Sequence, residues 1–114
     1  MLTKQQEEVI YHFVLLSIAK KVLELDLASL EKVPLKLKML YIERTVHVMN
    51  QISQELANIR KQMKITKLHI TKLRNDGTFT FYLVKTKDYE CTKQYLNIHL
   101  KRQIFQYIEE KSRS

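Results

Sequence analysis

The fold is decided by residues 39–63, which read MLYIERTVHVMNQISQELANIRKQM. Apolar residues recur in this stretch at steps of three or four, which is the spacing of one face of an α-helix, and polar residues fill the other face. The apolar positions are Met39, Ile42, Val46, Met49, Ile52, Leu56, Ile59 and Met63. The pattern predicts a long helix over residues 35–63.

One row of this helix repeats every seven residues and predicts a packing surface. Such a row suits antiparallel packing on another helix of the same chain, or a seam between two copies. Ser53 and Arg60 fall between its members and favour packing within the chain, although the dimer stays open. The residues expected to form this core stripe or dimer contact are Ile42, Val46, Met49, Leu56 and Met63.

A second buried helix is predicted at the N-terminus, over residues 3–25, and it should pack antiparallel on the long one. Thr3 followed by Gln6 is the pattern of a capping box. The run VIYHFVLLSIA at residues 9–19 carries two neighbouring apolar stripes, so a wide arc of the helix should be buried. The run is too short to span a bilayer, and no positive charge precedes it as in a secretory signal. Pro34 then breaks the helical pattern.

Residues 64–86 are ambiguous between a continued helix and a β-hairpin. The apolar repeat extends to Ile70, but β-branched residues are frequent there and prefer strands. The triplet Asn-Asp-Gly at residues 75–77 is a turn cluster. We therefore predict a hairpin of residues 65–73 and 78–86 packed on the helices. The residues expected on its buried face are Phe79, Phe81 and Leu83.

The remaining chain completes an α+β, mostly helical fold in a single domain of 114 residues. Residues 87–96 are interpreted as a connection or a short helical turn. Asn97 is the expected cap of a C-terminal helix over residues 97–110. The single glycine and single proline favour long helices over a loop-rich fold.

Several short motifs occur in a recognisable order. KVPLKLK at residues 32–38 precedes the long helix, TFT at 78–80 opens the second strand, and YECTKQYLN at 89–97 leads into the terminal helix. In this order they resemble the YhjD-like family of small uncharacterised proteins of Gram-positive, spore-forming bacteria, over residues 30–111. Gly77 departs from the family pattern, which often has a second acidic residue there. The resemblance implies the hairpin and a bacterial cytoplasmic setting, and it carries over no activity, cofactor or catalytic residue.

The composition argues against the common catalytic sites. Cys91 is the only cysteine, so the chain has no internal disulfide and no cysteine-based metal cluster, as in a reducing cytosol. The four histidines lack the i, i+4 spacing of a helical zinc motif. A single glycine cannot build a phosphate-binding loop, and no pair of carboxylates suggests acid–base chemistry. We therefore expect a cytoplasmic protein that is not an enzyme, without metal, cofactor or membrane partner.

Positive charge is concentrated in one segment. Residues 60–102 hold eleven basic and three acidic residues, so this segment carries the whole net charge of +8. Such asymmetry suggests an acidic partner, and exposed aromatic residues among the lysines suit nucleic acid. The expected binding residues are Arg60, Lys61, Lys64, Lys67, Lys72, Arg74, Lys85 and Lys87.

Two functions follow from these patterns. The first is a non-catalytic regulatory or protein-interaction module, working through an unknown protein partner or by homodimerisation. The alternative is a nucleic-acid-binding protein that uses the basic and aromatic segment 60–102.

Overall fold

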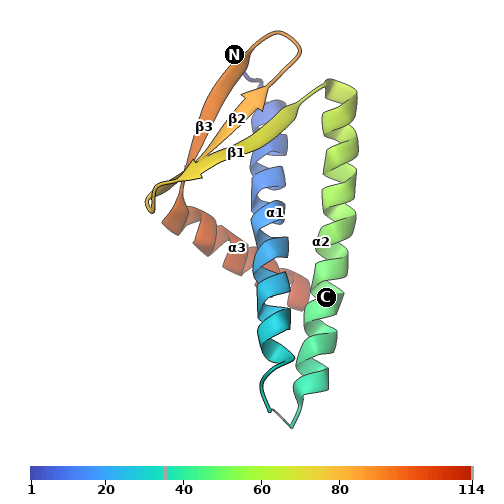
Figure 1. Ribbon diagram of the computed structural model, residues 1–114. Helices are drawn as coiled ribbons and strands as arrows, with labels where there is room; N and C mark the ends of the chain where they lie inside the picture. The colour runs from blue at the N-terminus through green and yellow to red at the C-terminus, as the bar shows by residue number, and fades with distance from the viewer. Residues whose placement is uncertain (35, 114) are drawn as a thin grey trace.

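The computed structural model describes residues 1–34 and 36–113, and within them it contains three helices and a three-stranded sheet (Figure 1). The elements in chain order are α1 (Lys4–Leu30), α2 (Lys38–Thr66), β1 (His69–Asn75), β2 (Phe79–Lys85), β3 (Glu90–Leu96) and α3 (Asn97–Ser112). The predicted α+β, mostly helical class is confirmed.

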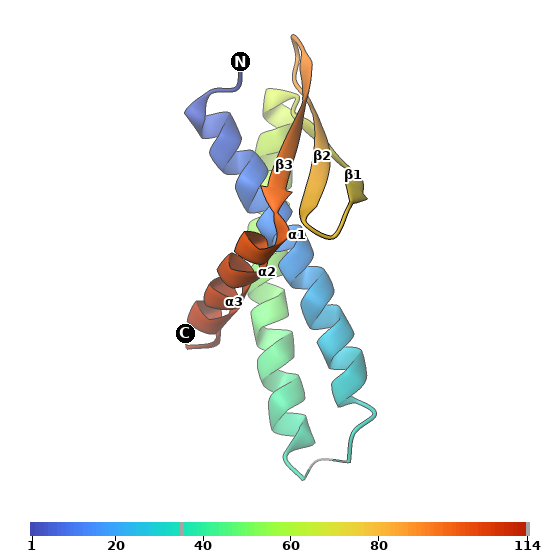
Figure 2. The ribbon, with the colours of Figure 1, turned by 90° about the vertical axis from the view of Figure 1, so that its left-hand side faces the viewer.

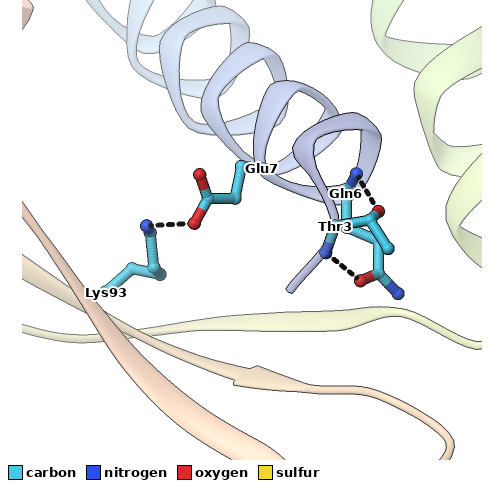
Figure 3. A network of polar contacts seen from close by, with 4 residues as sticks. All are labelled: Thr3, Gln6, Glu7 and Lys93. Carbon is cyan, nitrogen blue, oxygen red and sulfur yellow. Dashed lines mark hydrogen bonds and ion pairs between the residues drawn. The ribbon is translucent and has the colours of Figure 1, made fainter. Parts of the chain in front are cut away.

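The helices α1 and α2 form an antiparallel hairpin, as the two apolar patterns predicted (Figure 1). The predicted capping box starts α1: the Thr3 hydroxyl accepts from the Gln6 amide, and the Gln6 side chain accepts from the Thr3 amide (Figure 3). Glu7 in the first turn of α1 pairs with Lys93 of β3 at 3.3 Å and ties the helix to the sheet (Figure 3). The helix continues to Leu30, beyond the predicted end at residue 25, because no helix breaker occurs before Pro34.

The sheet has the order β1-β2-β3 with antiparallel neighbours, so the predicted hairpin is confirmed. Its first strand begins at His69 and not at residue 65, because α2 continues to Thr66. The interpretation of residues 87–96 as a connection or helical turn is wrong, because most of this segment forms β3. A tight turn closes the second hairpin: the Thr86 amide donates to the Tyr89 carbonyl at 2.8 Å. Cys91 and Tyr95 then pack against the core from the inner face of β3.

The predicted buried face of β2 is also wrong. The buried residues of this strand are Thr80, Tyr82 and Val84, whereas Phe79, Phe81 and Leu83 lie half-buried on the opposite face. Both rows contain large apolar residues, so alternation alone does not choose between them. The Tyr82 row belongs to the core, and the Phe81 row therefore lies on the outer face of the sheet.

The start of α3 differs from the expected cap. Leu96 holds the N-cap position without a side-chain cap. The Asn97 side chain instead joins α3 to the sheet: it accepts from the Thr80 hydroxyl at 2.6 Å and donates to the Asn75 side chain at 2.8 Å. From there α3 crosses the helical hairpin, and Tyr107 hydrogen-bonds to Glu55 of α2.

One hydrophobic core joins the inner face of the sheet, α3 and the sheet-proximal parts of α1 and α2. Its fully enclosed side chains are Ile10, Val14, Leu16, Ile52, Leu56 and Val84. The last buried residue of α1 is Leu23 and the first of α2 is Val48. Among the described helices, none has the length and apolar character needed to cross a bilayer.

The molecule is elongated, because the end of the helical hairpin projects past the sheet and α3 (Figures 1 and 2). Its extents are 54 × 30 × 20 Å, and its radius of gyration is 15.9 Å, against about 13 Å for a compact chain of this length. The accessible surface is 8189 Å², whereas a compact protein of 13.7 kDa exposes roughly 6,600 Å². This chain therefore exposes more surface than its mass requires.

Candidate functional site

The projecting end of the helical hairpin is the most apolar exposed region of the described chain. We call residues 24–34 and 36–47 the hairpin tip. None of these residues is buried, and several large apolar side chains are 37–63% exposed. They are Leu25, Val33, Leu37, Met39, Leu40, Tyr41 and Val46. Large exposed apolar patches mark interaction sites in many proteins, so this end of the hairpin is a candidate for such a site.

The charge of this end of the hairpin differs from that of the rest of the chain. Residues 24–47 contain four acidic and four basic residues, so they carry no net charge. The tip therefore has no general electrostatic attraction for polyanions and suits an apolar protein surface. The signal in the sequence was KVPLKLKMLY at residues 32–41, where apolar residues flank the helix break and are denser than a solvated loop requires.

The helices α1 and α3 diverge below the sheet (Figure 2). Residues of α1, α3, β1 and β2 line a groove of about 750 Å³. The floor and walls are mainly apolar, and ligand sites in proteins commonly have this volume. The apolar lining consists of Ile18, Val22, Leu23, Tyr82, Ile104, Phe105 and Ile108. The groove brings together residues that are far apart in sequence, so no local pattern indicated it.

The charged residues of this groove lie at two ends. Lys72 and Lys101 line the end next to the sheet, beside the hydrogen-bonded Asn97. Asp26 and Glu109 line the end away from the sheet; Glu109 is eight residues beyond Lys101, or about 12 Å along the axis of α3. The groove is therefore polarised, with positive charge near the sheet and negative charge away from it.

The outer face of the sheet presents a small basic and aromatic row. The Arg74 guanidinium lies 3.9 Å from the centroid of the Phe81 ring, and the Phe81 and Phe79 rings are 6.3 Å apart. Such a face can stack on nucleic-acid bases. Lys85 at the other end of this face is 3.9 Å from Glu90, which offsets part of its charge.

The structure does not gather the eight predicted basic residues into one site. Arg60, Lys61, Lys64 and Lys67 lie on the last turns and C-cap of α2, where the Arg60 guanidinium is 5.9 Å from the Phe13 ring centroid. Lys72 lines the groove, whereas Arg74 lies on the outer face of the sheet.

The residues of the predicted apolar stripe of α2 are buried towards the C-terminal end of the helix and more exposed towards its N-terminal end. Leu56 and Met63 belong to the core, and Met49 packs against it half-buried. Ile42 is also half-buried, whereas Val46 is exposed. The C-terminal part of the stripe thus contacts α1, and its N-terminal part belongs to the hairpin tip.

A tyrosine cluster joins α1 to the sheet. The Tyr95 ring centroid is 5.8 Å from that of Tyr11 and 6.0 Å from that of Tyr82. Burial, and then the nearby charge of Glu7, raises the pKa of Tyr95 to about 12. The hydroxyl therefore stays neutral at physiological pH. In the described part of the chain, no three His, Cys, Asp or Glu side chains are grouped so as to hold a metal ion.

The comparisons with known proteins agree with the resemblance seen in the motifs. The family model described as YhjD protein matches residues 1–113. An uncharacterized protein YhjD of Bacillus subtilis (strain 168) is 28% identical over 102 residues, which cover 87% of this chain and 85% of that protein. No solved structure matches. The family match includes the N-terminal helix, which had no motif of its own, and this chain belongs to the YhjD family.

Proposed function

We propose that this protein is a non-catalytic protein-interaction module that binds its partner through the hairpin tip. The observation that carries the proposal is the absence of any buried residue among described residues 24–34 and 36–47, although many of them are large and apolar. The end of a helical hairpin that lacks buried residues is completed when further helices pack on it. The partner is therefore a protein with an apolar helical face.

The exposure of Leu37 and Met39 supports this assignment. They are 60% and 63% exposed, and both lie beside the α1–α2 connection, which no other described element covers. Apolar side chains that are open in the free protein contribute binding energy when a partner buries them. The tip also carries charged residues of both signs, which suit the polar rim of a protein interface.

Site-specific photocrosslinking tests the proposal in the cells that produce the protein. With benzoylphenylalanine in place of Met39, we expect one discrete heavier adduct, whose mass separates a different protein from a second copy of this chain. The added change Leu37→Glu should remove the adduct without unfolding the protein. The matched control carries the crosslinker in place of Lys64, at the far end of α2. An absent adduct, or the same adduct from both positions, would contradict a partner at the tip.

A second candidate function is nucleic-acid binding by segment 60–102, favoured by the outward position of Phe79 and Phe81. Stacking of single-stranded bases needs exposed rings and nearby cations, and Arg74 supplies a cation. Fluorescence anisotropy with labelled single-stranded DNA and RNA tests it. Affinity should fall as salt rises and should be lost in Phe81→Ala and Arg74→Glu. No binding at low salt would exclude this function.

A further inference from the structure

One wall of the groove between α1 and α3 is formed by α3, and its lining residues there continue onto the exposed face of the helix. Lys101, Phe105 and Glu109 follow one another at steps of four and therefore lie on one face of the helix. Phe105, in the middle, is 68% exposed, although it borders an apolar hollow. The face thus presents an aromatic side chain between a positive and a negative charge.

The charges along this face of α3 are complementary to those of a second α3 that runs in the opposite direction. In a two-fold symmetric pair, residue i of one copy meets residue j of the other and j meets i. If two α3 helices lie antiparallel with their Phe105 residues at the axis, Lys101 of each copy faces Glu109 of the other. We propose that the protein forms a homodimer in which α3 of each copy lies over the groove of the other.

The α1 and β1 sides of the groove fit the same arrangement. Asp26 of α1 lies at the end of the groove that also holds Glu109, and Lys72 of β1 lies at the end that holds Lys101. An antiparallel α3 of the second copy therefore brings its lysine to the acidic end and its glutamate to the basic end. In the antiparallel orientation, each end of the groove faces a residue of opposite charge on α3 of the second copy. This favours the antiparallel over the parallel orientation.

The stability of α3 by itself does not account for this order of charges. The helix dipole favours acidic residues at the N-terminus and basic residues at the C-terminus. The first turn of α3 holds no acidic residue, and Glu109 and Glu110 lie near its C-terminal end, where Lys111 is the basic residue of the last turn. The Arg113 side chain pairs with Glu109 at 3.1 Å, but this is an exposed pair within one helix and is weak. Glu109 therefore remains available to a second copy.

A second copy also covers apolar surface that the single chain leaves exposed at the groove and at Phe105. Burying Phe105 in the apolar groove of the other copy removes both exposed apolar surfaces at once. Apart from Asp26, the residues of this interface lie outside the hairpin tip, so the dimer and the function proposed above can be tested separately.

Analytical ultracentrifugation of the purified full chain and its charge variants tests the dimer. The wild type should sediment as a dimer in equilibrium with monomer. Lys101→Glu places two glutamates opposite each other, and Glu109→Lys places two lysines opposite each other. Each change should weaken the dimer roughly tenfold or more, since like charges meet twice in a symmetric interface.

Mixing the two single variants gives the decisive measurement. A Lys101→Glu chain and a Glu109→Lys chain are complementary to each other, so together they should form a heterodimer that is tighter than the homodimer of either variant. The double variant should regain much of the affinity that each single variant loses, because Lys101 and Glu109 are exchanged while Asp26 and Lys72 keep their charges. Lost folding cannot produce either recovery, and circular dichroism of each variant checks the fold.

Three further variants assign the interface. Phe105→Asp should abolish the dimer, whereas Phe105→Leu should keep most of it. Lys64→Glu makes the same charge change on α2, away from α3, and should leave the dimer intact, as should Leu37→Glu at the tip. A wild type that stays monomeric at high concentration would overturn the proposal. So would a dimer that is unaffected by Phe105→Asp, or one that Leu37→Glu dissociates.

Discussion

The two ends of the helical hairpin differ in how far their apolar residues are buried, although their sequence patterns are similar. Both contain apolar residues at helical spacing. At the sheet end, Ile10 and Ile52 are fully buried between the helices and the sheet. At the tip, Met39 and Leu25 sit on the same two helices and remain more than half exposed. An amphipathic pattern therefore identifies a face that needs a partner, and the tertiary structure decides whether the chain itself supplies that partner.

The largest expected effect contrasts one truncation at each end. Ile52→Ala removes a fully buried side chain from the core and should cost about 2–5 kcal/mol of unfolding free energy. Met39→Ala truncates a side chain that is 63% exposed and should change stability by no more than about 0.5 kcal/mol. Urea denaturation of the purified protein measures both values. Equal losses would mean that the tip is packed in the isolated protein.

A smaller effect compares how the two helices begin. Thr3→Ala removes the capping box at the start of α1 and should cost about 1 kcal/mol. The N-cap of α2 is Leu37, which makes no side-chain hydrogen bond to the helix. Leu37→Asp supplies an acceptor and a negative charge at that N-terminus and should stabilise the free protein by about 0.5 kcal/mol. Thermal unfolding of both variants checks the opposite signs.

The failure of Leu37→Asp to stabilise would also be informative. Leu37 has φ −100° and ψ 26°, outside the extended conformation of Thr3, so a new cap must adjust the backbone. If the tip is free to adjust, the gain appears. If stability falls instead, Leu37 already packs within the chain, and the contrast between the two ends is smaller than its exposure indicates.

Much of the fold was predictable because its signals are local. The signals are the capping box at Thr3, the apolar repeat of α2 and the turn at residues 75–77, and each relates residues that are only a few positions apart in sequence. The strand β3 was missed because its inner row includes Lys93, which breaks the apolar alternation. The partner of Lys93 is Glu7, 86 residues away in sequence. Only the folded chain reveals that a charged residue in this row is satisfied.

The candidate surfaces were less predictable for a related reason. The net charge of segment 60–102 was evident, but its residues are distributed over α2, the sheet and the groove. In β2 the buried row is the one with Thr80 and Val84 beside Tyr82, and the two phenylalanines are on the outside. Hydrophobicity alone favours the opposite choice. Which row is buried depends on the face that α1 covers, and that is a property of the tertiary packing.

The smallest effect concerns alkaline pH and should affect the sheet end only. Burial raises the pKa of Tyr95 from its usual value near 10 to about 12, so the folded state holds this proton more tightly than the unfolded state. The resulting stability is complete below pH 10 and is lost as pH rises from 10 to 12. Tyr95→Phe should therefore flatten the decline of unfolding free energy over that range, as followed by urea denaturation. Tyr41→Phe, at the tip, is the matched control and should decline like the wild type. If both variants flatten equally, ionisation of Tyr95 in the cluster with Tyr11 is not what weakens the sheet end at high pH.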